Sequence, residues 1–366
     1  MKISGSNELL EQIQNNNLCV GCGACVGICP YFKAHKGKVA MTFSCDRTEG
    51  RCYAHCPGTE TDYDVLANEL FNKPYEEKPI GNYIKIYGAK AGEKAVNGSF
   101  QNGGTVTTLM KFAMEKGLIN SAVLTDSIDM IPDPQIVTKS DEIGNFSSTK
   151  YMASPTVSKF NEAIKMGHKK IGVVGTPCQM KAIGKIKSNP LDREEFKKPE
   201  TFLIGLFCTW AVDTKNFIKL LESKTDISKI KSMDIPPPPD EVFILKTETE
   251  AIEIPLDDIR KIVPEGCSLC PDMTCEWADI SVGAFEGRSG WNTLIVRTKK
   301  GEELINSAIS EGYLTVEEFP DENVTHLTKG SVGKKKRGLA KREELMKSMD
   351  QNDNGSATAP SVVGFR

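Results

Sequence analysis

The chain has 366 residues, of which 39% are hydrophobic and 26% charged, and its formal net charge is −3 at pH 7. These values are ordinary for a soluble globular protein of two or three domains, and they give no indication of nucleic-acid binding. The N-terminus lacks the apolar core of a signal peptide, and no apolar run is long enough to span a membrane. We therefore expect a cytoplasmic protein whose twelve cysteines are ligands or free thiols, not structural disulfides.

The first distinctive stretch is a cysteine run that follows a predicted short helix at residues 4–15. The run reads Cys19-Val-Gly-Cys22-Gly-Ala-Cys25-Val-Gly-Ile-Cys29-Pro30. This C-x2-C-x2-C-x3-C-P spacing is the one by which bacterial ferredoxins hold iron–sulfur clusters. A zinc site is the alternative, but zinc sites typically pair two separate C-x2-C units. The run therefore predicts a ferredoxin-like iron–sulfur domain over residues 1–73.

The rest of this domain contributes three more cysteines, Cys45, Cys52 and Cys56. In two-cluster ferredoxins the cysteine before a proline ligates the other cluster. By this rule Cys56, which precedes a proline, completes one set, which is Cys19, Cys22, Cys25 and Cys56. The second set then holds three thiolates, which are Cys29, Cys45 and Cys52.

Three interpretations of this second set stay open. They are a [3Fe–4S] cluster, a fourth ligand such as Asp46 or His55, and a cysteine from elsewhere in the chain. We favour a solvent-exposed loop position for His55, because most histidines beside a cluster are not ligands. Twelve cysteines would make three sets of four, and Cys275 is the cysteine left over to complete the second set. We nevertheless favour a buried free thiol at this position.

A linker between Pro74 and Pro79 leads to a second domain, expected over residues 80–330, in which strands and helices alternate. Strands are predicted at residues 83–91, 121–126, 170–175 and 201–207. Helices are predicted at residues 103–116, 155–167, 177–187 and 214–221. Such alternation argues for a sheet with crossover helices. The expected fold class is thus α+β or α/β, with a ferredoxin-like domain followed by a mixed α/β domain.

After four prolines at residues 236–239 the pattern becomes more β-like, and a second cysteine group follows with Cys267 and Cys270. Strands are predicted at residues 278–285 and 293–298, and a helix at 301–312. The last segment, residues 331–366, combines a basic helix from Lys334 with a polar tail that we expect to be disordered. We interpret the basic run as a solvated helix face and not as a partner site.

Two loops of the α/β part carry residues suited to a ligand. Gly103-Gly104-Thr105-Val-Thr107 opens a helix and exposes backbone N–H groups to a phosphate, although glycine-rich helix caps are common. Gly175-Thr176-Pro177-Cys178 follows a strand, at the sheet edge where ligands of open α/β sheets bind. Cys178 and Cys208 each follow a strand. They are either buried core thiols or, with Cys267 and Cys270, the ligands of a further [4Fe–4S] cluster.

A series of motifs in this part resembles the beta subunit of the coenzyme F420-reducing hydrogenases and F420-linked dehydrogenases. The motifs are Gly103-Gly104-Thr105, Lys150-Tyr151 with Ser154-Pro155, Val174-Gly-Thr-Pro-Cys178-Gln179, Gly205-Leu-Phe-Cys208, Cys267-x2-Cys270, Ala278-Asp-Ile-Ser-Val-Gly283 and Gly290-Trp291-Asn-Thr. The resemblance covers about residues 15–340. It rests on an ordered series and not on a single short match.

The resemblance implies an iron–sulfur flavoprotein with FAD and two or three [4Fe–4S] clusters, one of them held by Cys178, Cys208, Cys267 and Cys270. It also implies an FAD site formed by Gly103, Gly104, Thr105, Thr107, Lys150, Tyr151, Ser154 and Thr176. Such a subunit is expected to pass electrons between F420, or a similar hydride carrier, and a catalytic partner subunit. That partner is of the hydrogenase, formate dehydrogenase or heterodisulfide reductase type.

A flavin is needed in such a protein because hydride carriers transfer two electrons at once, whereas clusters accept one at a time. We assign Lys150 the catalytic role of stabilising the anionic reduced flavin, and an exposed surface lysine is the alternative. The competing functions are a ferredoxin-like adaptor without a flavin, an NAD(P)-linked flavoprotein subunit and a zinc-stabilised binding protein. No G-x-G-x-x-G follows a predicted strand, which weakens a Rossmann-type NAD site.

Overall fold

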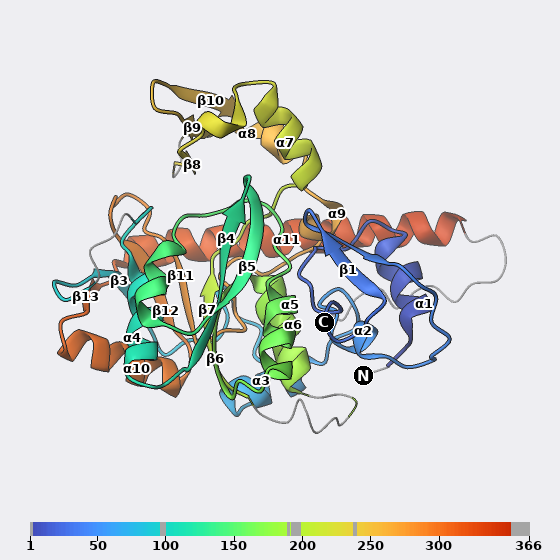
Figure 1. The fold of residues 1–366 in the computed structure, drawn as a ribbon, viewed down its shortest axis with the longest axis horizontal. Helices are drawn as coiled ribbons and strands as arrows, with labels where there is room; N and C mark the ends of the chain where they lie inside the picture. The colour runs from blue at the N-terminus through green and yellow to red at the C-terminus, as the bar shows by residue number, and fades with distance from the viewer. Residues whose placement is uncertain (1–2, 96–99, 189–190, 192–198, 237–239, 353–366) are drawn as a thin grey trace.

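The computed structural model describes residues 3–95, 100–188, 191, 199–236 and 240–352. Within them the chain forms an N-terminal block, a central α/β domain, a small antiparallel sheet above it and one long C-terminal helix (Figure 1). The predicted fold class, a ferredoxin-like domain followed by a mixed α/β domain, is confirmed. The expected disordered tail lies, from residue 353 on, outside the described residues.

The N-terminal block is built from short elements around a small core. Its elements are α1 (Ser6–Leu9), the π-helical turn η1 (Leu10–Gln14), the hairpin of β1 (Phe32–His35) and β2 (Lys38–Met41), α2 (Arg51–Ala54) and α3 (Tyr63–Phe71). Leu9, Ile13, Phe32 and Tyr53 are buried together. Leu9 of α1 and Ile13 of η1 therefore face the interior of this block.

The central sheet has eight strands in the order β13-β3-β12-β11-β7-β6-β4-β5. The strands are β3 (Lys85–Ala91), β4 (Ser121–Ile128), β5 (Ile131–Val137), β6 (Lys170–Gly175), β7 (Glu200–Leu206), β11 (Ile280–Ala284), β12 (Asn292–Val296) and β13 (Leu314–Glu318). The inner four, β4, β6, β7 and β11, run parallel, and the flanking strands pair antiparallel. β5 contains Pro132 and Pro134, which lack an N–H donor, and it lies at the sheet edge, where prolines are tolerated.

Helices cover both faces of the sheet. α4 (Thr105–Glu115) and α10 (Lys299–Ser310) pack on one face, and α5 (Thr156–Lys165) and α6 (Pro177–Lys187) pack on the other. Consecutive residues of β4 follow this division, since Val123 belongs to the core under α5 and α6 while Ala122 and Leu124 belong to the other. The 3-10 helix η2 (Ser140–Asn145) contacts α4.

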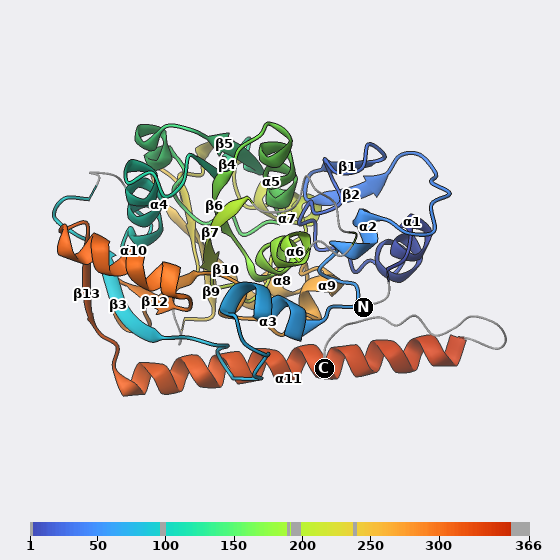
Figure 2. The same ribbon diagram turned by 90° about the horizontal axis from the view of Figure 1, so that it is seen from below.

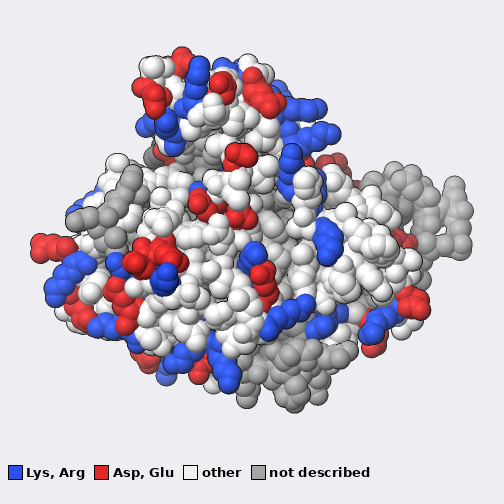
Figure 3. Space-filling view, viewed as in Figure 1, with Lys and Arg blue, Asp and Glu red and all other residues white. Residues whose placement is uncertain are grey.

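A small antiparallel sheet stands above the carboxyl ends of the parallel strands (Figure 1). It consists of β8 (Ser232–Asp234), β9 (Val242–Lys246) and β10 (Ala251–Pro255), accompanied by α7 (Thr214–Glu222), η4 (Ile227–Lys229), α8 (Leu256–Arg260) and α9 (Glu265–Ser268). Its core joins Phe217 and Phe243 to Met152 of the central domain. On the face drawn in Figure 3, basic and acidic side chains are interspersed over this small sheet.

The last element, α11 (Asp321–Asn352), is a single helix of 32 residues. It begins before the boundary expected at residue 330 and runs along the side of the molecule that faces away from the viewer in Figure 1, past α3 toward the N-terminal block (Figure 2). Leu327 packs with residues of the central sheet, and Leu345 packs with the core of the N-terminal block. Among the described helices, none is long and apolar enough to cross a membrane.

Candidate metal centres and cofactor site

All twelve cysteines are free thiols in the structure, and eleven of them fall into three groups. The first group is Cys19, Cys22, Cys25 and Cys56. Burial raises the pKa of each of these thiols, and neighbouring thiols of the group add to the effect at Cys22, Cys25 and Cys56. Thiols that are this hard to ionise on their own are suited to a cationic iron centre, which stabilises thiolates. These four side chains therefore fit the cluster that the spacing predicts.

The loop of the first group lies directly against the α/β domain. The backbone of Cys22 accepts a hydrogen bond of 3.0 Å from the N–H of Val157, at the start of α5. Asn161 donates to the carbonyl oxygens of Ala24 and Val26. Gly23 has a φ of +83°, and a Cβ there would come within 2.7 Å of the backbone of Pro155. The cysteine loop and the second domain are therefore in van der Waals contact.

The second group, Cys29, Cys45 and Cys52, also comes together. Burial raises the pKa of Cys52 to about 11, and the thiols of Cys29 and Cys45 act on it in the same direction. The expectation that His55 is exposed is wrong, because its side chain is only 1% exposed. Burial, followed by the charges of Arg51 and Lys185, lowers its pKa to about 3, so the imidazole is neutral. Asp46 is exposed.

The third group joins three distant segments of the α/β domain. Cys178 opens α6 after β6, Cys208 follows β7, and Cys267 and Cys270 belong to α9 and the loop after it. Burial raises the pKa of Cys178 and Cys208, and the other thiols of the group reinforce the shift. Cys178 and Cys208 are 30 residues apart in the sequence, and they come close because they follow the neighbouring parallel strands β6 and β7.

The first and third groups are neighbours. After burial, the largest contribution that raises the pKa of Cys22 comes from Cys178 of the other domain. Gly266, one residue before Cys267, approaches the backbone of Leu18, one residue before Cys19, so closely that a Cβ would not fit. The two halves of the chain thus bring eight cysteines into one continuous region. Within the described residues, no three His, Cys, Asp or Glu side chains are placed to hold a single metal ion.

Cys275 lies apart from the incomplete second group. Its side chain is fully buried, and its charge interactions are with Asp272 and Arg297, followed by Cys208 and Cys178. Its sulfur lies 3.8 Å from the carbonyl oxygen of Gly175 and fills the space that Gly205 leaves open. This position is that of a buried thiol packed behind the third group.

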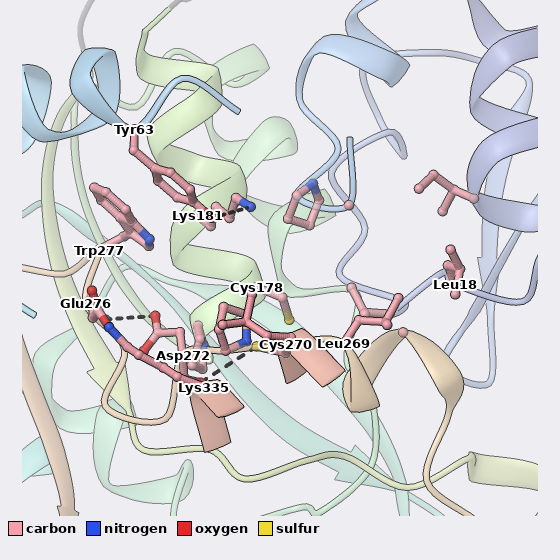
Figure 4. Close-up of a pocket in the computed structure, with 18 of the residues that line it drawn as sticks. Leu18, Tyr63, Cys178, Lys181, Leu269, Cys270, Asp272, Glu276, Trp277 and Lys335 are labelled. Atoms are coloured by element: carbon pink, nitrogen blue, oxygen red, sulfur yellow. Dashed lines mark hydrogen bonds and ion pairs between the residues drawn. The ribbon is translucent and has the colours of Figure 1, made fainter. Parts of the chain in front are cut away.

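A pocket of about 110 Å³ lies beside Cys178 and Cys270 (Figure 4). Trp277 and Tyr63 form one wall, with ring centroids 5.4 Å apart and planes 7° from parallel. Lys181, from α6, donates a hydrogen bond of 3.3 Å to the Tyr63 hydroxyl. Burial lowers the pKa of Lys181 to about 8, and the thiols of Cys270 and Cys56 partly oppose this shift. The pKa of Lys181 therefore depends on the charge of both the first and the third cysteine group.

Two further buried lysines contact the cysteine loops. Lys185, one turn after Lys181, donates to the carbonyl oxygens of Cys56 and Glu60, both at 2.8 Å, and to the Thr59 hydroxyl at 2.9 Å. Lys334 of α11 donates to the carbonyl oxygens of Cys208 and Asp272. No sequence pattern predicted the burial of these three lysines, because it arises from the packing of α3, α11 and the N-terminal block. The interpretation of the basic run as a solvated helix face is wrong for its first residue, Lys334, which is 4% exposed.

The residues expected to bind FAD converge at the carboxyl edge of the sheet. Gly104 precedes α4 with a φ of +73°, and no side chain among the described residues caps this helix start. The hydroxyl oxygens of Thr105 and Thr108 are buried and have no hydrogen-bond partner in the part of the chain that the structure describes. Uncapped N–H groups and unpartnered hydroxyls are the groups that a phosphate satisfies. The turn therefore fits the diphosphate end of a dinucleotide. The space beside Gly104 is filled by the ring of Phe100.

Gln101, which the sequence analysis missed, connects this turn to the other expected flavin residues. Its side-chain carbonyl accepts from the backbone N–H of Thr149 at 2.7 Å, and its amide donates to the Tyr151 hydroxyl at 3.4 Å. The same amide donates to Asp234 of β8 at 3.1 Å. The glycine turn, the 150–154 segment and the small sheet therefore meet at one residue.

Lys150, Ser154 and Thr176 have defined partners in this region. The ammonium of Lys150 lies 3.3 Å from the Asp126 carboxylate, and its side chain is 15% exposed, so it is not an exposed surface lysine. Ser154 belongs to a buried hydroxyl network with Thr156. Thr176 caps α6 and lies 3.4 Å from the Cys178 sulfur. The pocket beside Cys178 is lined by none of the residues expected to bind FAD.

Comparisons with known proteins agree with this arrangement. Residues 86–160 match the N-terminal part of the family described as coenzyme F420 hydrogenase/dehydrogenase, beta subunit, and residues 168–322 match the C-terminal part of the same family. The chain belongs to the coenzyme F420 hydrogenase/dehydrogenase beta subunit family. Residues 13–31, which contain the first cysteine run, match the 4Fe-4S binding domain. The family that the motif series resembles is thereby confirmed.

Relatives in this family include enzymes with named activities. The coenzyme F420 hydrogenase subunit beta of Methanosarcina barkeri is 29% identical over 65% of this chain and 82% of its own length. The coenzyme F420-dependent sulfite reductase of Methanocaldococcus jannaschii is 29% identical over 85% of this chain, which corresponds to 49% of that larger protein. A chain in the solved F420-reducing [NiFe] hydrogenase complex from Methanosarcina barkeri is also similar. It has 25% identity and a TM-score of 0.67, with 78% of this chain and 99% of that chain covered.

These comparisons confirm that the chain is an oxidoreductase subunit of the electron-transferring beta type with a 4Fe-4S domain. Flavin binding, the cluster ligands and the identity of the carrier stay predictions at this point.

Proposed function

We propose that the chain passes electrons between a hydride carrier at an FAD site and a partner protein, through [4Fe–4S] clusters held by the three cysteine groups. The observation that carries this proposal is the contact between the first and third groups, in which Cys22 of the N-terminal block and Cys178 of the α/β domain are neighbours. Centres at these positions would lie in series, with no separate carrier needed between the domains.

The order of the centres follows from the positions of their ligands. Cys178 and Cys208 lie at the same carboxyl edge of the sheet as the FAD residues, so the third group is the one beside the flavin. The first group follows, and the second group lies farthest along the N-terminal block. FAD, when bound, accepts an electron pair as hydride and releases the electrons one at a time. Because the second group lies farthest from the FAD residues, it is the group that passes electrons to the partner.

The residues around the FAD site have separate tasks. The start of α4, with Gly103, Gly104, Thr105 and Thr107, binds phosphate through backbone N–H groups and hydroxyls. Tyr151 and Ser154 line the site, and Thr176 connects it to the Cys178 loop. Lys150, held near Asp126, supplies a positive charge that favours a reduced, anionic flavin.

F420 is the carrier that we propose, because the relatives named above are F420-dependent enzymes. The partner is a catalytic subunit of the hydrogenase, formate dehydrogenase or heterodisulfide reductase type, and a cytoplasmic location is part of the same proposal. An NAD(P)-linked subunit and a ferredoxin-like adaptor without FAD are the competing functions.

Anaerobic reduction of the purified protein with F420H2, NADH and NADPH in parallel tests the proposal. We expect F420H2 alone to bleach the flavin absorbance near roughly 450 nm and the cluster shoulder near roughly 400 nm, values typical of these cofactors. Bleaching by NADH or NADPH instead would identify the NAD(P)-linked alternative. A protein that purifies with clusters but without flavin would be the adaptor.

A further inference from the structure

Lys334 is a buried residue of α11 that contacts the loops of the third cysteine group. Its side chain is 4% exposed, and its ammonium donates to the carbonyl oxygen of Cys208 at 2.6 Å and to that of Asp272 at 2.7 Å. The two acceptors belong to different loops, one after β7 and one after α9, and each loop supplies cysteines of the third group. One ammonium thus joins two of the three segments that supply that group.

The thiols of Cys270, Cys208 and Cys267 and the carboxylate of Asp272 are close enough to interact with the charge of this ammonium. The neighbouring Lys335 is paired with Glu276 at 2.9 Å, which neutralises most of its charge. The ammonium form of Lys334 is the one that donates to both carbonyl oxygens, and it brings a positive charge next to the ligand loops.

A buried positive charge affects a cluster in a predictable direction. Each electron that enters a [4Fe–4S] centre with four thiolate ligands adds a negative charge, and the protein interior screens this charge weakly. Net charge and hydrogen bonding around the sulfurs are among the factors that set cluster potentials. A fixed ammonium close to the ligand loops therefore stabilises the reduced state more than the oxidised state.

We propose that Lys334 is a positioning residue that ties the two ligand loops of the third cysteine group together and raises the reduction potential of the [4Fe–4S] centre held there. The proposal rests on the cluster assignment made under the proposed function. It gives α11 a role in electron transfer, although the residues that match the family end at residue 322, just after this helix begins. A raised potential makes this centre a better acceptor for electrons from the flavin.

The test is an anaerobic redox titration of the full chain, followed by EPR. The signal that Cys267→Ser abolishes identifies the third centre, and the iron content of each variant is measured alongside. We expect Lys334→Met to lower the ratio of reduced to oxidised third centre at a fixed potential roughly tenfold, which is about 59 mV for a one-electron couple. Lys334→Arg, which keeps the charge, is expected to stay near the wild-type value. Lys336→Met, which changes an exposed lysine of the same helix, is the matched control.

Three outcomes would overturn the proposal. The first is a Lys334→Met potential equal to that of Lys336→Met, and the second is an equal shift in Lys334→Arg and Lys334→Met. If Lys334→Met loses its iron, the potential of the third centre is measured in Lys334→Gln instead, because glutamine removes the charge but keeps a hydrogen-bond donor. Iron loss in both uncharged variants is the third outcome and would show a purely structural role. If the wild-type protein has no signal that depends on Cys267, the proposed function fails, and that result is distinct from all three.

Discussion

Replacement of Lys185 by methionine should weaken the contact between α6 and the N-terminal block. The Lys185 side chain is 1% exposed, and its ammonium satisfies the buried carbonyl oxygens of Cys56 and Glu60 as well as the Thr59 hydroxyl. Methionine fills a similar volume but donates no hydrogen bond. The Thr59 hydroxyl still donates to the carbonyls of Tyr53 and Cys56, and the Thr59 N–H also donates to the Cys56 carbonyl. The loss therefore falls mainly on the hydrogen bond from Lys185 to the Glu60 carbonyl.

Loss of a buried hydrogen bond from an ammonium costs about 1–3 kcal/mol. That amount is a large fraction of the stability of a typical domain. Urea denaturation under anaerobic conditions measures the effect as a lower midpoint, and iron release to a chelator should accelerate at the same time. Lys187→Met is the control, since Lys187 forms a partly exposed pair with Glu69 at 3.6 Å, and such pairs contribute little. Equal midpoints for the two variants would refute this reasoning.

Three further outcomes are expected. Iron chelation should lower the melting temperature as well as bleach the spectrum, because the third cysteine group joins three distant segments; bleaching at constant melting temperature would contradict this. Gly104→Val should release FAD before the clusters, because φ is +73° at this helix start and a Cβ would meet the Phe100 ring at 2.6 Å. The flavin content of the purified variant measures this loss, and full flavin occupancy would refute the placement of the FAD site. Burial, followed by the charge of Asp272, raises the pKa of Glu276 to about 7. Between pH 4.5 and 7 the folded state therefore keeps a proton on this carboxyl that the unfolded state has lost. The free energy of unfolding falls as the pH rises through this range. Glu276→Gln should remove up to about 3 kcal/mol of that decline in urea titrations, and an unchanged pH profile would contradict the assignment.

Local patterns predicted the parts of this structure that depend on spacing and periodicity. The alternating strands and helices from residue 83 on, and the positions of Cys178 and Cys208 at strand ends, follow from apolar periodicity and from the geometry of parallel sheets. β5 was not predicted, because Pro132 and Pro134 argue against a strand anywhere except at a sheet edge.

Features that depend on how the domains pack were not predictable. His55 is buried because the N-terminal block closes over it, whereas its loop-like sequence favours exposure. Lys181, Lys185 and Lys334 are ordinary surface residues by composition, and only the contact of α6 and α11 with the cysteine loops makes them buried donors. Gln101 bonds to Thr149, 48 residues away, and to Asp234, 133 residues away, and no local pattern encodes contacts over such separations.

The order of the electron path is tested most directly by anaerobic mixing of F420H2 with the wild-type protein and with Cys267→Ser, followed by flavin absorbance and EPR of the N-terminal clusters. In the wild-type protein, flavin bleaching should be followed by the cluster signals. In Cys267→Ser, the flavin should still bleach, but the signals that depend on Cys22 should not develop, because the third centre lies between the flavin and the first. Equal development of those signals in both proteins would contradict the proposed path.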